Sequence, residues 1–140
     1  MSLLYEEVTG KILEASFEVI NELGAGFLEG VYEKALTIAL REKALNIQVQ
    51  VPLKVIFRGH CVGEYYADLL VEDKVIVELK AVKALAPEHL AQVINYLRAT
   101  SIKVGLLINF GHPKLEYRRL FGPEANLGQN IQDRQDCGHG

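Results

Sequence analysis

Apolar residues recur at helical spacing over the first third of the chain, and this pattern predicts two helices. The first runs from Leu4 to Leu23, with charged residues largely between its apolar positions, as is typical of an amphipathic helix. The glycines that follow, up to Gly26, end it because glycine readily adopts the left-handed conformation of a helix C-cap. A second helix is predicted from Glu29 to about Ala44.

From residue 47 the apolar positions recur at every second residue, so the middle of the chain is predicted to form β-strands. The predicted segments are a strand at 47–57, a turn at 58–60, a strand at 62–71, a turn at 72–74 and a strand at 75–81. Pro52 indicates that the first strand lies at an edge of the sheet. One face of the third strand is wholly apolar, whereas the other carries Glu78 and Lys80.

A third helix, a fourth strand and a tail complete the predicted order. The helix is opened by Pro87 and ends near Thr100, and the continuous apolar run Val104–Phe110 is typical of a strand covered on both faces. We allow for a short terminal helix after it. The order predicts an α/β fold in which helices flank a mixed sheet, made of an antiparallel meander and a crossover strand. We expect a single domain over residues 1–122 and a mobile tail over residues 123–140.

Composition and charge narrow the functions that the chain can have. Hydrophobic residues make up 49% and charged residues 24% of the 140 residues, as in soluble globular proteins. The net charge of −3 argues against a protein that coats nucleic acid non-specifically, but it leaves room for an enzyme with an acidic metal site. The N-terminus lacks the basic region of an export signal, and no apolar run reaches the length of a membrane span. We therefore expect a cytoplasmic protein without a membrane partner.

Three charged residues in an otherwise apolar sheet are the strongest functional signal. Glu78 and Lys80 are two residues apart and leave the same face of a strand, and a turn centred on Asp73 would place Asp68 opposite Glu78. Two neighbouring carboxylates repel unless a positive charge lies between them, and hard divalent cations prefer such oxygen ligands. The alternative is an ordinary salt bridge of Lys80 with Glu78 or Asp68 at a solvated margin of the sheet.

Asp68, followed after nine residues by Glu78, Leu79 and Lys80, resembles the signature of the PD-(D/E)XK nuclease superfamily. The resemblance implies a restriction-endonuclease-like core. It also implies that both acidic residues and the Leu79 backbone carbonyl bind Mg²⁺ (or Mn²⁺) and that Lys80 assists the attacking water. Ala67 stands where the motif has proline, a position that is not a ligand.

Two further motifs support the resemblance. Gly26–Tyr32 resembles the G-x-x-E-x-x-Y motif of a small bacterial family in this superfamily, which implies that Glu29 is a further catalytic and metal-binding residue and that Tyr32 contacts substrate. Gln92–Tyr96 resembles the Q-x-x-x-Y motif of RecB-like nucleases, which implies that both residues position the substrate. Each of these residues also has a plainer explanation. Glu29 could be present because the helix dipole favours a carboxylate in the first turn, and Tyr32 could be a core residue. Gln92 and Tyr96 could be an ordinary pair on the surface of a helix.

The preferred hypothesis is a metal-dependent nuclease that hydrolyses nucleic-acid phosphodiester bonds, with DNA favoured over RNA. Its catalytic residues would be Asp68, Glu78, Lys80 and Glu29. The alternative is a catalytically silent binding or assembly module with the same fold. The alternating first strand, with little edge protection, could pair with a second copy in a homodimer.

Overall fold

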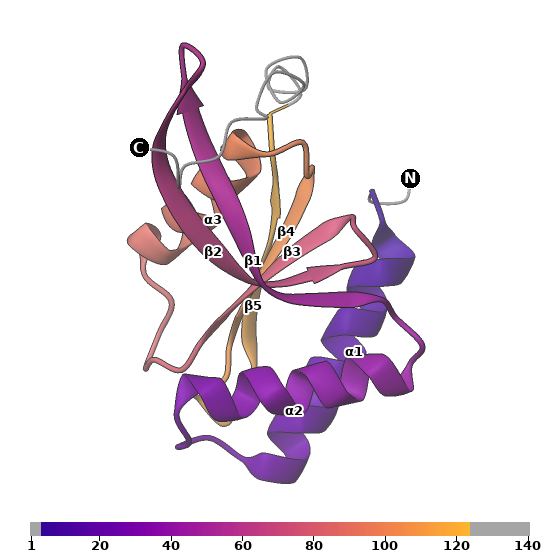
Figure 1. The fold of residues 1–140 in the computed structure, drawn as a ribbon. Coiled ribbons are helices and arrows are strands. Elements are labelled where there is room, and N and C mark those ends of the chain that lie inside the picture. The colour runs from indigo at the N-terminus through magenta and orange to yellow at the C-terminus, as the bar shows by residue number, and fades with distance from the viewer. Residues whose placement is uncertain (1–3, 124–140) are drawn as a thin grey trace.

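Five strands form one mixed sheet, in the order β1-β2-β3-β4-β5, in a computed structural model that describes residues 4–123 (Figure 1). The elements are α1 (Glu6–Leu23), α2 (Glu29–Glu42), β1 (Ile47–Phe57), β2 (His60–Val71), β3 (Val75–Lys80), α3 (Pro87–Ala99), β4 (Val104–Asn109) and β5 (Glu116–Phe121). The predicted mixed sheet flanked by helices is therefore confirmed.

The connections between strands also follow the prediction. β1, β2 and β3 form an antiparallel meander, and the crossover through α3 places β4 parallel to β3. Strand β1, which contains Pro52, lies at an edge of the sheet as predicted. All six residues of β4 are buried, in agreement with its continuous apolar sequence.

The short terminal helix allowed for after the fourth strand is wrong, because this segment forms β5. It pairs antiparallel with β4 and makes the second edge of the sheet. Its six residues, Glu116–Phe121, are half-buried or exposed. An edge strand takes its stability from backbone pairing with its one neighbour, so its side chains need no regular apolar alternation, and the sequence shows none there.

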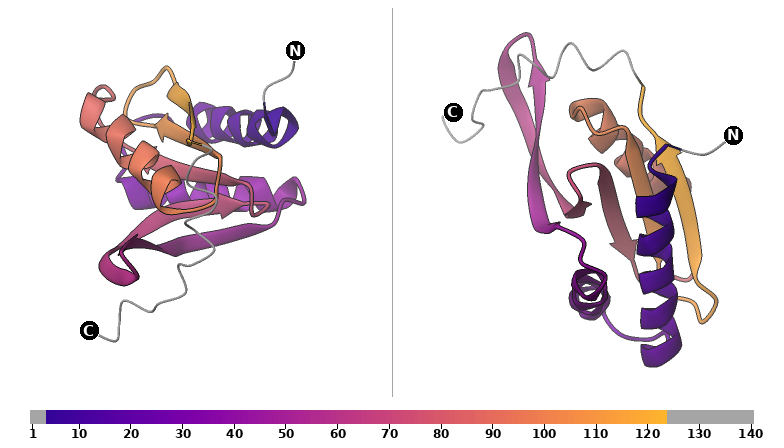
Figure 2. Two further views of the ribbon diagram at one scale, coloured as in Figure 1. Left: turned by 90° about the horizontal axis from the view of Figure 1, so that it is seen from above. Right: turned by 90° about the vertical axis from the view of Figure 1, so that its right-hand side faces the viewer.

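Helices cover both faces of the sheet (Figure 2). Helices α1 and α2 share a hydrophobic core with Val75, Val77 and Leu79 of β3, whereas α3 shares a second, smaller core with Ile76. Because side chains alternate along a strand, Glu78 lies on the same face as Ile76, toward α3. The predicted two-faced character of this strand is confirmed.

The outer part of the β1–β2 hairpin turns away from the rest of the sheet toward α3. Ile47 and Leu69 pack in the core beside α1 and α2, whereas Val51 and Ala67 pack in the core beside α3. Uninterrupted alternation would have kept each strand's two residues on one face. The alternation breaks at Gln50, whose φ of 52° is unusual for a residue with a side chain. Figure 2 shows this hairpin rising away from the other strands.

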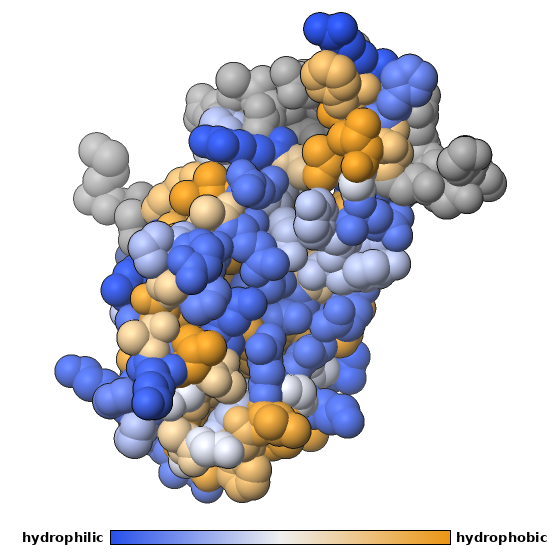
Figure 3. All heavy atoms as spheres, turned by 90° about the vertical axis from the view of Figure 1, so that its left-hand side faces the viewer, coloured by the Kyte–Doolittle hydropathy of each residue, from blue (hydrophilic) through white to orange (hydrophobic). Residues whose placement is uncertain are grey.

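Exposed apolar side chains lie close to the projecting end of the hairpin, beside the charged Arg58 at its tip. Phe57 and Val62 are exposed there, and Figure 3 shows apolar side chains gathered at this end while the middle of the same face is hydrophilic. No helix among residues 4–123 combines the length and the apolar character needed to cross a membrane. The expected tail, residues 123–140, lies outside the described residues except for Pro123.

Candidate active site

Strands β2 and β3 separate at Asp68 and Glu78. Their backbone pairing covers only the three residue pairs next to the turn and stops before these two acids. Beyond that point, hydrogen bonds between the acidic side chains and the backbone of the opposite strand join the two strands. Glu78 Oε1 accepts a hydrogen bond from the Asp68 backbone N–H (2.7 Å), and Asp68 Oδ2 accepts one from the Leu79 backbone N–H (2.8 Å). We call this point the fork. The predicted juxtaposition of Asp68 and Glu78 is confirmed, and each carboxylate holds the opposite strand.

Both carboxylates at the fork are buried, with only 9% of Asp68 and 4% of Glu78 exposed. Burial, followed by the charge of Asp68, raises the pKa of Glu78 to about 8, although the Asp68 N–H and the charge of Lys80 act against this rise. Burial also raises the pKa of Asp68, while hydrogen bonds from Leu79 and Gln50 oppose it. Without a cation, Glu78 is therefore mostly protonated at pH 7.

Lys80 lies on the same strand as Glu78, two residues further on. Its charge lowers the pKa of Asp68, Glu78 and Glu29, so it acts on all three acids. Among residues 4–123, however, no ion pair within 4.0 Å joins Lys80 to Asp68 or Glu78. These residues therefore do not form the simple salt bridge at a solvated margin that was the alternative. The two acids are buried, and the Lys80 amine forms no ion pair with either of them.

Glu29 is the first residue of α2 and lies near the fork. Burial and then the charge of Asp68 raise its pKa, while the charges of Lys80 and His89 lower it. Within the described part of the chain, no three His, Cys, Asp or Glu side chains stand close enough together to hold a metal ion. The structure thus brings Glu29 to the neighbourhood of Asp68 without forming a site of three carboxylates.

Gln50 is a residue of this site that sequence reasoning missed. Its side-chain amide donates to Asp68 Oδ1 (3.2 Å) and to Glu33 Oε1 of α2 (3.1 Å), so it links β1, β2 and the second helix. In the sequence it is one of several polar residues that alternate with apolar ones along β1. Only its positive φ, which no local pattern predicts, sets it apart from Gln48.

Tyr32 supports the loop that leads into α2. The side chain is fully buried and stacks on Phe110, with 5.0 Å between the ring centroids. Its hydroxyl donates to the Gly24 carbonyl (2.6 Å) and accepts from the Phe27 backbone N–H (3.1 Å). Gly26 in the same loop has a φ of 114°, a conformation that residues with a side chain rarely adopt. The tyrosine therefore lies in the core, where it fixes the start of the helix that carries Glu29.

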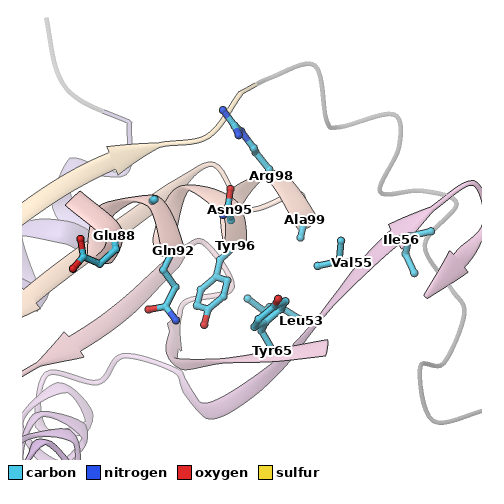
Figure 4. Close-up of a pocket in the computed structure, with 11 residues that line it drawn as sticks. Leu53, Val55, Ile56, Tyr65, Glu88, Gln92, Asn95, Tyr96, Arg98 and Ala99 are labelled. Carbon is cyan, nitrogen blue, oxygen red and sulfur yellow. The ribbon is translucent and has the colours of Figure 1, made fainter. Parts of the chain in front are cut away.

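Gln92 and Tyr96 project from α3 into a groove of about 540 Å³ between this helix and the outer β1–β2 hairpin (Figure 4). Burial, and then the charges of Glu78 and Asp68, raise the pKa of Tyr96 to about 12. Tyr96 therefore lines the groove and lies near enough to the fork for both acids to act on its hydroxyl, and Gln92 stands one helical turn before it. The structure brings both residues of the Q-x-x-x-Y pattern into one groove and places Tyr96 near the candidate site.

The fork has the donor atoms that a divalent cation needs. Each carboxylate has about four lone-pair positions, so the hydrogen bonds described above leave oxygen sites unused. Magnesium and manganese prefer such oxygen ligands. Burial raises the pKa of both carboxylates, and the charge of Asp68 raises that of Glu78 further, so a cation between them would stabilise both as anions. The residues present therefore fit a divalent metal ion.

Comparisons with known proteins agree with this fold. A family model described as the PD-(D/E)XK nuclease superfamily matches residues 6–120. No curated protein matches the chain. A solved structure, the crystal structure of SSO0001, is similar over 92% of this chain and 64% of that chain, with 18% sequence identity and a TM-score of 0.51. The chain thus spans somewhat less than two thirds of that protein's length, and the likeness is one of fold: a restriction-endonuclease-like mixed sheet flanked by helices.

Proposed function

The chain belongs to the PD-(D/E)XK nuclease superfamily, whose members generally use divalent metals, and on this basis we propose that it is a metal-dependent nuclease. The reaction would be hydrolysis of a nucleic-acid phosphodiester bond. The observation that carries the proposal is the fork, where two buried carboxylates face each other beside a lysine that forms no ion pair with either.

Asp68, Glu78 and the Leu79 backbone carbonyl would hold Mg²⁺ (or Mn²⁺), with Glu29 as an outer or additional ligand. A cation bound there supplies Lewis-acid stabilisation of a phosphate oxygen and lowers the pKa of a bound water. The raised pKa of Glu78 and Asp68 supports this assignment, because a cation would convert both groups to the charged form that binds it.

The protein's own groups would orient the reactants. In hydrolysis a water oxygen bonds to phosphorus, the bond from phosphorus to one sugar oxygen breaks, and that oxygen leaves with a proton. Lys80 would orient the water or stabilise the charge that develops on the phosphate. Gln92 and Tyr96 would position the substrate at the mouth of the groove. We propose that Tyr32 contributes indirectly, by fixing the loop in front of Glu29, since its hydroxyl is committed to that loop.

We also propose that the chain belongs to the narrower G-x-x-E-x-x-Y family and has a RecB-like core. The three named positions of the first motif have separate physical roles that support this assignment. Gly26 takes a positive φ, Glu29 begins α2 near the fork, and Tyr32 ties the loop to the core. A motif whose residues act on one loop is better evidence of relationship than its letters alone.

Further parts of the proposal concern context. DNA stays favoured over RNA, the expected place of action is the cytoplasm, and residues 1–122 are proposed to act as one domain. The position of β1 at an open edge of the sheet supports a homodimer formed by pairing of this strand with its copy.

Metal binding is the first test, because it needs no guess about the substrate. Magnesium and manganese would be titrated by calorimetry into the wild-type protein and into Asp68→Asn and Glu78→Gln variants. Asp73→Asn is the matched control, since it removes an exposed carboxylate from the turn of the same hairpin. Saturable binding that the first two variants lose and the control keeps would support the proposal. Binding that ignores the substitutions would contradict it.

If the titration shows no metal binding, it is repeated in the presence of a short DNA, because a phosphate oxygen of the substrate can supply a missing ligand of the metal ion. Absence of metal binding in both conditions would overturn the proposal. Lys80→Gln separates binding from chemistry, since it should keep metal binding and lose cleavage of DNA.

The second candidate function is a catalytically silent binding or assembly module. One observation favours it: the hydrogen bonds of Asp68 and Glu78 hold the two strands at the fork, so both acids have a structural use without any reaction. A protein that binds nucleic acid in magnesium, but leaves single-stranded DNA, duplex DNA and RNA intact, would favour this candidate over the nuclease.

A further inference from the structure

The groove between α3 and the outer β1–β2 hairpin has features that the proposed hydrolysis does not require. Its volume of about 540 Å³ lies within the usual range for small-ligand sites. Leu53 and Tyr65 of the hairpin face Gln92 and Tyr96 of the helix, and Asn95 adds a second amide (Figure 4). The lining thus combines an apolar floor, aromatic rings and amide groups.

Two tyrosines give the groove an aromatic wall. The rings of Tyr65 and Tyr96 lie with their centroids 6.0 Å apart and their planes at 45°. Tyr96 is almost fully buried, whereas 51% of Tyr65 is exposed. The buried ring therefore fixes the orientation of the exposed ring, which keeps free surface for a planar ligand.

The groove lies near the fork, although neither acid lines it. Tyr96 lines the groove, and the charges of Glu78 and Asp68 act on its hydroxyl. A nucleotide chain with one phosphate at the acid pair would therefore place its neighbouring bases at the groove.

The lining carries one carboxylate, Glu88, and one guanidinium, Arg98, and the chemistry of its other side chains suits nucleobases better than phosphates. Leu53, Val55, Ile56 and the alanines of α3 offer no hydrogen bonds to a phosphate, and burying a charge against such groups is costly. A base, in contrast, has an apolar face that stacks on an aromatic ring and polar edges that pair with amides such as those of Gln92 and Asn95.

We propose that this groove binds unpaired nucleobases, so that the preferred substrate is single-stranded nucleic acid or a strand with an unpaired segment at the site of cleavage. The inference rests on the proposed nuclease function for the phosphate position. In a duplex the bases stack on one another and their pairing edges are occupied, so they cannot enter the groove without unpairing.

The test measures binding without cleavage. The anisotropy of a short fluorescein-labelled oligothymidine, and of the same label on a duplex, is followed in EDTA and again in magnesium with the Glu78→Gln protein. Tyr65→Ala should weaken single-strand binding roughly 5- to 150-fold, which corresponds to the usual worth of stacking one base on an aromatic ring. Tyr65→Phe should bind like the wild type, because stacking does not need the hydroxyl.

Tyr66→Ala is the matched control. Tyr66 is the same kind of residue on the same strand, 52% exposed, but it does not line the groove, and its hydroxyl donates to Glu64. This variant should bind as the wild type does. Urea denaturation of each variant shows whether a loss of binding reflects a loss of folding.

The outcomes separate this inference from the nuclease proposal. Duplex binding as tight as single-strand binding, or a Tyr65→Ala variant that binds like the wild type, would overturn the groove assignment even if the wild type cleaves duplex DNA. Single-strand binding that depends on Tyr65, in a protein that cleaves nothing, would support the groove while refuting the nuclease.

Discussion

Replacing Glu78 by glutamine should make the metal-free protein more stable at alkaline pH. In the folded protein the pKa of Glu78 is about 8, whereas the ordinary value that applies in the unfolded chain is 4.5. Between these values the folded state holds a proton that the unfolded state has lost. The free energy of unfolding of the wild type should therefore fall as pH rises from about 4.5 to about 8 and level off above.

The magnitude follows from the two pKa values. A change from 4.5 to about 8 corresponds to roughly 5 kcal/mol of unfavourable interaction for the buried carboxylate form. Glutamine has almost the same shape, and its carbonyl oxygen can still accept the hydrogen bond from the Asp68 N–H. Glu78→Gln should thus remove the charge and keep the contact, so the variant should exceed the wild type in stability by up to this amount near pH 9.

Urea denaturation in EDTA, at intervals from pH 5 to pH 9, measures this difference. A smaller decline should remain in the Glu78→Gln protein, because the pKa of Asp68 and Glu29 is also raised. Glu22→Gln removes an exposed carboxylate of α1 and should leave the wild-type profile unchanged. Equal declines in the wild type and the Glu78→Gln protein would refute the electrostatic account of the fork.

The same urea denaturation, repeated with added magnesium, tests whether the ion binds at the fork. Because the carboxylates bind metal in the charged form, added magnesium should raise the stability of the wild type most at pH 8 and above. The Glu78→Gln protein should respond much less. A variant that gains as much stability from magnesium as the wild type would show that the ion binds elsewhere.

Two further predictions concern the supports of the site. Gln50→Gly should be more stable in urea than Gln50→Ala by about 1 kcal/mol, because glycine adopts a φ of 52° without strain; equal stability would contradict the strained conformation. Tyr32→Phe should lower the free energy of unfolding by roughly 1–3 kcal/mol, because the buried partners of its hydroxyl lose their hydrogen bond, whereas Tyr66→Phe should change it little. A Tyr32→Phe protein as stable as the wild type in urea would contradict the proposed support of the loop.

Much of the fold can be predicted from the sequence because periodicity reports burial. The alternation in β3 and the continuous apolar run of β4 correspond to strands with one or both faces covered by helices, and Pro52 indicates the edge position of β1. Strand β5 has one neighbour and a mostly exposed surface, so its side chains carry no such signal.

The acid pair was also predictable, because a short turn sets the register of a hairpin. The way in which Asp68 and Glu78 hold each other's backbone was not, since it depends on the separation of two strands in space. Gln50 was missed for the same reason. Its role comes from a local break in β1 and from the approach of α2, and neither can be seen in an alternating polar residue.

The fork also determines how the sequence can change over generations. Asp68 and Glu78 join two strands, so a descendant that no longer cut nucleic acid would still need side chains at both positions that accept these backbone hydrogen bonds. Within residues 4–123 the Lys80 side chain enters no hydrogen bond or ion pair, so apart from the effect of its charge on the acids it is free to change once chemistry is lost. Among descendants of this protein, loss of the lysine, with each acid either kept or replaced by its amide, would be the mark of a lineage that has given up catalysis.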